Sequence, residues 1–334
     1  MKLWVALSYF FGEPRSEVWQ LELQTGQKEL SFDIPQLKSR QVAGKGVTGL
    51  RLSSAQHFLC CDFNTVYLID KKGVVQAQYF DEQNNDLHNL YVDLKPNDQS
   101  DNGSIYVVNT GLDCIDVLSF NLKRLARYEG VSFEQLKLRC ESPKYCDGDY
   151  YQDGEHQAFF QTKVQDKWHF NHVIKLPLEL GGQLLATSLS RRAMVDLTTM
   201  KLASNVLPCS PHDGVVWRNG LWVTTVEGKI YRADLSAYTA SCLLQFELVF
   251  DLFCHGQYHG WCRGLAFSGN KVWVGLTAIY RQNSRTKWLD VPLEQTRTGI
   301  YQLCAIHWQI EQFYDFSDTD GARIFSFVVA GDND

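Results

Sequence analysis

Short stretches in which apolar and polar residues alternate recur along the chain, separated by turns that contain glycine. Residues 209–235 hold three such stretches and two turns: 213–217, 221–225 and 229–233, with turns at 218–220 and 227–228. Alternation with a period of two, broken by short glycine turns, predicts an antiparallel meander of three strands. A meander of this size cannot bury both of its faces alone, so it indicates a unit that repeats.

The same pattern groups the strands of the whole chain. Five groups of four predicted strands begin at residues 47, 88, 171, 213 and 263. The N-terminal group has three strands, at 2–10, 17–23 and 28–33, and one strand, 323–329, is left at the C-terminus. Pairing of 323–329 with 2–10 would complete a sixth group and leave no long sheet edge exposed. The sequence therefore predicts an all-β fold, a six-bladed β-propeller whose last blade is closed by N-terminal strands plus one C-terminal strand.

Two polar segments interrupt this rhythm, near 130–167 and 279–297. We interpret them as insertions in a single propeller domain that spans residues 1–334. The spacing from His88 to Asn171 is twice that between other neighbouring groups, so a meander within 130–167 would give seven blades instead of six.

Composition narrows the class of protein. Of the 334 residues 13% are aromatic, which suits β-structure, and the net charge is −6 with scattered basic residues. Such a charge argues against nucleic-acid binding. The apolar N-terminal stretch is too short to span a membrane and is a poor signal peptide. Ten cysteines without a C-x-x-C pair indicate free, buried thiols. We therefore expect a cytoplasmic protein with no nucleic-acid or membrane partner.

Four stretches resemble motifs of a known family: PHDGVVWRNGLWV, CRGLAFSGNKVWVGL, YVVNTGLDCIDVLS and GARIFSFVV. They cover most of residues 86–330 and are similar to motifs of an uncharacterised bacterial family of six-bladed propellers, a domain of unknown function. That family would have HLNGLAL where this chain has HFNHVI at 169–174. More distantly, the chain resembles the propellers of calcium-dependent lactonases and of strictosidine-synthase-like proteins. The resemblance implies the fold and assigns no activity.

In a propeller the innermost strand of each blade begins near the central axis, so equivalent positions converge there. Aligning the six predicted inner strands brings together one residue from each: Thr48, His88, Asn171, Asp213, Arg263 and Arg323. Residues just before these strands, or at the end of a second strand, add His169, His212 and Asn109. Convergent polar groups of this kind predict a ligand site. The alternative is that they only bind channel water and neighbouring turns.

Three kinds of chemistry suit this ring. Arg263 and Arg323, with His88 or His212 nearby, could clamp a carboxylate, phosphate or sulfate. His88, Asn171 and Asp213 could hold one divalent metal ion. His88, or His212 with Asp213, could serve as catalytic acid and base, although consecutive strand residues are expected to point to opposite faces.

The resemblance to lactonase propellers bears on the metal site. Those enzymes place a carboxylate, an Asn and an Asp around the axis. Asn171 and Asp213 match this pattern, but Thr48 stands where a Glu would be needed. This departure argues against a lactonase, and two nearby arginines also oppose a cation.

We therefore predict a propeller with a polar axial pocket that binds, and could transform, a small anionic metabolite. The alternatives are a metal-dependent, lactonase-like hydrolase and a non-catalytic scaffold that binds a protein partner at the rim, through 130–167 and 279–297. The sequence leaves open whether the protein is an enzyme.

Overall fold

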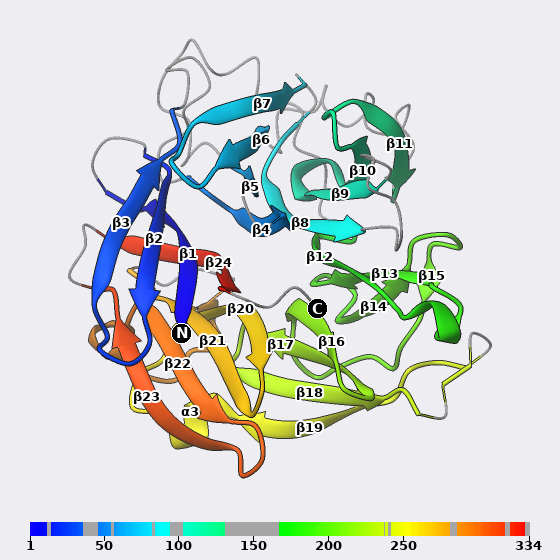
Figure 1. Cartoon of the computed structure of the whole chain (residues 1–334). Coiled ribbons are helices and arrows are strands. Elements are labelled where there is room, and N and C mark those ends of the chain that lie inside the picture. Colours follow the sequence, from blue (N-terminus) through cyan, green and yellow to red (C-terminus); the bar gives the residue numbers. More distant parts are fainter. Residues whose placement is uncertain are drawn as a thin grey trace.

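A computed structural model describes six four-stranded antiparallel sheets arranged in a ring (Figure 1). The described residues are 1–11, 15–35, 46–54, 57–81, 84–93, 103–130, 167–236, 238–239, 242–280, 286–317 and 321–330. The predicted all-β, six-bladed propeller is confirmed.

The sheets are numbered in chain order, and each is given from its inner to its outer strand. The first contains β24 (Ala322–Val329), β1 (Lys2–Tyr9), β2 (Glu17–Glu22) and β3 (Lys28–Asp33). The second contains β4 (Gly49–Ser54), β5 (His57–Cys61), β6 (Thr65–Asp70) and β7 (Val75–Phe80). The third contains β8 (Leu87–Asp93), β9 (Ser104–Asn109), β10 (Cys114–Ser119) and β11 (Arg124–Glu129).

The fourth sheet contains β12 (Phe170–Lys175), β13 (Leu184–Ser188), β14 (Ala193–Asp196) and β15 (Lys201–Leu202). The fifth contains β16 (Pro211–Trp217), β17 (Gly220–Thr225), β18 (Lys229–Asp234) and β19 (Phe246–Asp251). The sixth contains β20 (Trp261–Ser268), β21 (Lys271–Thr277), β22 (Gly299–Cys304) and β23 (Gln309–Asp315). The short helices among the described residues are η2 (Thr110–Leu112), η4 (Leu178–Leu180), α3 (Leu252–His255) and η6 (Leu293–Gln295).

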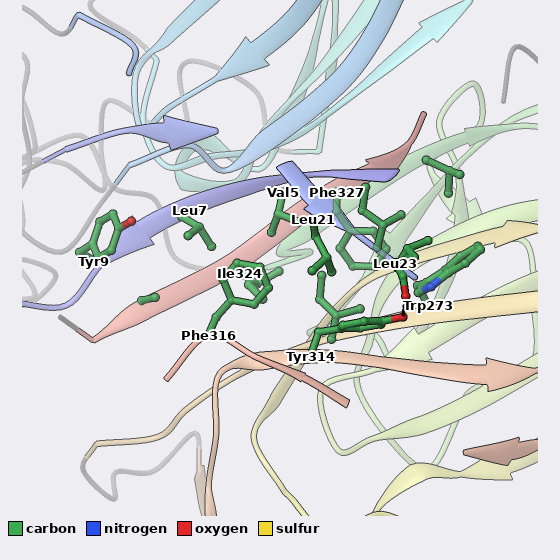
Figure 2. Close-up of a cluster of buried hydrophobic side chains, with 14 residues drawn as sticks. Val5, Leu7, Tyr9, Leu21, Leu23, Trp273, Tyr314, Phe316, Ile324 and Phe327 are labelled. Carbon is green, nitrogen blue, oxygen red and sulfur yellow. Dashed lines mark hydrogen bonds between the residues drawn. The ribbon is translucent and has the colours of Figure 1, made fainter. Parts of the chain in front are cut away.

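The ring closes through the two ends of the chain. Strand β24 pairs antiparallel with β1, from Leu3 opposite Val329 to Tyr9 opposite Ala322, and in Figure 1 the red β24 lies beside the blue β1. Apolar side chains of the first and sixth sheets pack together behind this joint, among them Val5, Ile324 and Trp273 (Figure 2). The predicted pairing of 323–329 with 2–10 is therefore confirmed.

The number of blades follows from the inner strands. They contact one another in the order β24, β4, β8, β12, β16, β20 and back to β24. Because β8 touches β12 directly, the third and fourth sheets are neighbours, and the alternative of seven blades is excluded. The predicted insertion near 130–167 falls almost wholly on residues 131–166, which lie outside the described part of the chain. The described parts of 279–297 lie between β21 and β22.

The hydrophobic core is divided among the spaces between neighbouring sheets. Six clusters of buried apolar side chains each join two adjacent sheets. Both faces of a middle strand are therefore covered, and all six residues of β17 are buried. The outermost strands are largely exposed, as in the pattern of β11. This gradient explains why a second strand such as β17 (GLWVTT) is largely apolar and an outer strand such as β11 (RLARYE) is largely polar.

Two local predictions need correction. The last strand of the group that begins at residue 171 was expected at 201–206, but it ends at Leu202, because the hydroxyl of Ser204 accepts from the Met194 N–H at 2.9 Å in place of a strand partner. Cysteines were expected to be buried, yet Cys242 and Cys254 are exposed, while Cys60, Cys61, Cys114 and Cys262 are buried. None of the helices in the described residues is long and apolar enough to span a membrane.

Candidate functional site

The inner strands are irregular where they begin, and this irregularity shapes the site. In β16 the pairing with β17 passes from Pro211 to Gly214, so His212 and Asp213 together face one partner residue, Thr224. The same shift occurs in β8, β12 and β20. A β-bulge turns two consecutive side chains toward the same side of a sheet. The expectation that His212 and Asp213 point to opposite faces is therefore wrong, because it assumed a regular strand.

Five polar side chains and one aromatic ring form a first layer, which we call the upper layer: His88, His169, His212, Arg263, Arg323 and Phe325. The ring of His88 lies 5.8 Å from that of His169 and 5.9 Å from that of His212, between ring centroids. The guanidiniums of Arg263 and Arg323 lie 4.0 and 4.8 Å from the centroid of Phe325. Five of these six come from residues that the sequence placed on or beside the ring.

Asp213 is the centre of a second layer. Its Oδ2 lies 2.6 Å from His212 Nδ1 and accepts from the Gly264 N–H at 2.7 Å. Its Oδ1 accepts from Asn89 Nδ2 at 3.1 Å and lies 3.3 Å from His172 Nδ1. These four groups belong to β8, β12, β16 and β20. The Asp213 carboxylate therefore links the third, fourth, fifth and sixth sheets at the axis.

Burial and these contacts decide the charge states. Burial alone would raise the pKa of Asp213, but His212 and His172 beside it hold that pKa well below its usual range. Burial lowers the pKa of His212, and that of His88 well below its usual range. We therefore assign Asp213 as a carboxylate and His212 as a neutral imidazole whose Nδ1–H donates to it.

Gly264 allows the bulge of β20 to form this contact. Its φ is +77°, and a methyl group at its Cα would come within 2.5 Å of the Phe327 ring. Only glycine adopts this backbone without strain, so its N–H can reach Asp213.

His169 is held in the upper layer by a residue from a distant loop. The carboxylate of Asp113 accepts from three successive backbone N–H groups, of Lys167 at 2.7 Å, Trp168 at 3.1 Å and His169 at 2.7 Å. His169 has a φ of +50°, which the three hydrogen bonds stabilise. The start of β12 is thereby fixed against the third sheet.

Two further charged residues border the cluster. Arg51 of β4 donates to Ser326 Oγ at 3.2 Å and interacts electrostatically with Asp213. Asp86 lies beside His88, with 3.8 Å between its Oδ1 and His88 Nδ1. The axial cluster therefore holds three guanidiniums and two carboxylates, with Asp213 already bound to several donors.

Three residues that the sequence placed at the axis make structural contacts. Thr48 donates its hydroxyl hydrogen to the carbonyl of Leu87 and so connects the second sheet to the third. Asn109 is buried and accepts from the Asn85 N–H at 3.2 Å, which fixes the turn before β8. Asn171 is the extra residue in the bulge of β12, and its Nδ2 lies 3.5 Å from the Pro211 carbonyl oxygen.

Sequence reasoning missed Asn89, His172 and Arg51. The first two directly follow His88 and Asn171, which the alignment of strand starts had selected. Since each bulge adds one residue, the side chain that reaches Asp213 is displaced by one position. The polar pairs His88-Asn89, Asn171-His172 and His212-Asp213 were the available signal, because a buried regular strand seldom has two polar residues in succession.

The proposed metal site finds no support in the described residues. No group of three or more His, Cys, Asp or Glu side chains in those ranges is arranged to hold a metal ion. The three candidate ligands also have other contacts: His88 with Asp86, Asn171 with Pro211, and Asp213 with His212. The metal site therefore stays a prediction made from the sequence.

Comparison with known proteins extends the description of the fold. No protein-family model and no curated protein matches the chain. A solved structure of a protein of unknown function from Bacteroides caccae is 10% identical with a TM-score of 0.59, covering 98% of this chain and 97% of that one. The β-propeller domain of Cps50 (Swd1) from Myceliophteria thermophila is 13% identical with a TM-score of 0.50, covering 90% and 82%. The first is consistent with the resemblance to an uncharacterised bacterial family. At such identities these likenesses show the fold alone, a β-propeller, and the number of six blades comes from the sheets of this chain.

Proposed function

We propose that the upper layer of the axial cluster binds a small anionic molecule. The observation that carries this proposal is the pair of guanidiniums, from Arg263 and Arg323 on adjacent inner strands, that both lie against the ring of Phe325. A guanidinium presents its N–H groups in one plane, which matches the oxygens of a carboxylate or a phosphate. Two of them packed against the same ring favour a ligand with negative charge.

The surroundings support a negative rather than a positive ligand. His88 and His212 are neutral at pH 7, because burial lowers their pKa values, so they add hydrogen-bonding groups without adding charge. Asp213, the nearest carboxylate to His212, is turned toward the second layer by its bonds to Gly264 and Asn89. The guanidiniums therefore dominate the charge of the upper layer.

The stacking determines how the proposal is tested. Arg263 lies over both Trp261 and Phe325, at 5.4 and 4.0 Å, so alanine would remove packing as well as charge. Methionine keeps most of the apolar stem and removes only the guanidinium. We expect Arg263→Met to weaken binding of phosphate, sulfate or lactate about tenfold or more, because a charge-assisted hydrogen bond contributes about 1.5–3 kcal/mol.

A matched control is available on another sheet. Arg218 is exposed and lies 4.1 Å from the centroid of Trp217, at the opposite end of β16 from His212. Arg218→Met should leave anion binding unchanged when titrations are followed by calorimetry. Equal affinities in both variants would refute the proposal, as would a stoichiometric divalent metal in the purified protein together with no response to any anion.

A second candidate function is protein binding at an exposed aromatic cluster. Phe10, Phe11 and Tyr280 pack ring to ring at 5.0–6.2 Å, and Phe11 and Tyr280 are 54% and 42% exposed. Because Arg323 lies 4.3 Å from the centroid of Phe10, this cluster borders the upper layer. Exposed aromatic clusters of this kind are common in binding surfaces. If the protein is a scaffold, removal of 279–297 should abolish capture of a partner while Arg263→Met has no effect. Anion binding lost in Arg263→Met, with capture of partners intact, would favour the axial site.

A further inference from the structure

We propose that the anion bound at the axis carries a hydrogen-bond donor next to its charge, such as the hydroxyl of a 2-hydroxy carboxylate or of hydrogen phosphate. This inference deepens the proposed function and rests on it. The feature that carries it is the imidazole of His212, whose two nitrogens have unequal surroundings.

The proton of this imidazole is on Nδ1. Nδ1 lies 2.6 Å from Asp213 Oδ2, which also accepts from the Gly264 N–H at 2.7 Å. A buried carboxylate that already has one short donor is stabilised by a second, and an imidazole can supply it only with a hydrogen on Nδ1. The backbone of His212 is held as well, because its carbonyl accepts from the Thr187 hydroxyl at 2.7 Å.

The other nitrogen, Nε2, is therefore a hydrogen-bond acceptor. The residue His212 is only 3% exposed, and its Nε2 has no hydrogen-bond partner among the described residues. A buried acceptor without a donor costs about 1–3 kcal/mol, so the site favours a ligand that supplies one. A second acceptor in the same state, Oδ1 of Asn171, belongs to the amide that approaches Pro211, the neighbour of His212.

The ring of His212 also belongs to the upper layer that forms the proposed anion site, and the charge of Arg263 acts on it. The ring of His212 is 5.9 Å from that of His88, and the ring of His88 is 6.0 Å from that of Phe325. Phe325 is the ring against which Arg263 and Arg323 lie. A small molecule whose anionic group meets the guanidiniums therefore has its remaining atoms in the layer that includes the His212 ring. An anion without a hydrogen to donate would place a lone pair against the lone pair of Nε2.

Two matched pairs of probes test this selectivity by calorimetry at pH 7.5. Hydrogen phosphate and sulfate have the same charge and similar size, but only the phosphate carries an O–H. Lactate and propionate differ only by the 2-hydroxyl. We expect the member of each pair that carries the O–H to bind about tenfold more tightly, since leaving one buried acceptor without a donor costs about 1–3 kcal/mol.

The variant His212→Asn separates this role from simple support of the fold. The Asn amide nitrogen can take the place of Nδ1 as donor to Asp213, while no acceptor remains at the position of Nε2. We expect the preference for phosphate and lactate to fall to about twofold or less, with sulfate and propionate bound as before. His212→Gln, whose amide can instead reach the position of Nε2, should keep part of the preference.

The outcomes separate the two proposals. If all four anions bind equally and Arg263→Met weakens all of them, the anion site stands and the requirement for a donor is wrong. If the preference persists undiminished in His212→Asn, another residue is responsible and the inference is also wrong. If none of the four binds with a Kd below about 10 mM, the proposed function fails and this inference fails with it.

Discussion

Replacing Phe327 with alanine should reveal how much stability depends on the strand that closes the ring. Phe327 lies on β24, opposite Val5 of β1, and is buried in the cluster between the first and sixth sheets (Figure 2). Its ring packs against Gly264 and Gly275, where an added methyl group would come within 2.5 and 3.1 Å of Cε1. The substitution removes one ring from the joint and leaves the backbone pairing in place.

The size of the effect follows from these neighbours. Removing a buried phenylalanine ring costs about 3–5 kcal/mol, and the cost depends on how far the surroundings can collapse into the space. Gly264 and Gly275 have no side chains to move into it, so we expect a cost no lower than the middle of this range, about 4 kcal/mol. Because a domain is commonly stable by about 5–15 kcal/mol, the variant should fold but unfold at a much lower urea concentration.

Equilibrium unfolding in urea, followed by tryptophan fluorescence, measures this difference. The control is Leu248→Ala on β19, because Leu248 is an apolar residue that is half exposed on an outer strand. Its free energy of unfolding should change by about 0.5 kcal/mol or less. A Phe327→Ala protein whose unfolding midpoint moves no further than that of Leu248→Ala would show that this joint contributes little.

Two other predictions concern the closure and the axis. Deletion of 321–334 removes β24, exposes the edge of β1 and should cause aggregation or loss of folding; a monomeric product with an unchanged melting temperature in scanning calorimetry would contradict the closure. Stability should also fall in acid. Burial holds the pKa of His88 well below 6.5, so in acid the unfolded chain takes up a proton that the folded protein does not. The free energy of unfolding therefore decreases as the pH falls below about 6.5, by up to about 1.4 kcal/mol per pH unit. The carboxylate of Asp213, whose pKa is lowered, adds stability that is present above its unfolded pKa near 3.8 and is lost only as the pH falls through its lower folded pKa. Urea unfolding at a series of pH values should show a smaller loss between pH 7 and 5 for His88→Gln, and an identical profile would contradict this assignment.

The axial cluster shows where inference from single strands fails. Aligned strand starts identified His88, Asp213, Arg263 and Arg323 as residues near one another, and the structure does bring them to the axis. The alternation of side chains along a regular strand predicted that His212 and Asp213 point to opposite faces of the sheet. Their contact at 2.6 Å depends on a β-bulge, which forms because backbone and side chains from neighbouring sheets bind the displaced residues.

The sequence by itself determined the strands, their grouping in fours and the closure by β24, because these depend on local alternation, on glycine turns and on the count of strands at the two ends. Only the tertiary structure decided which polar groups meet. Asn89, His172 and Gly264 reach Asp213 from three different sheets, and no local pattern encodes a distance between them. It also decided that Thr48 joins two sheets, since a hydroxyl on a strand can serve a ligand or a carbonyl equally well until its neighbours are in place.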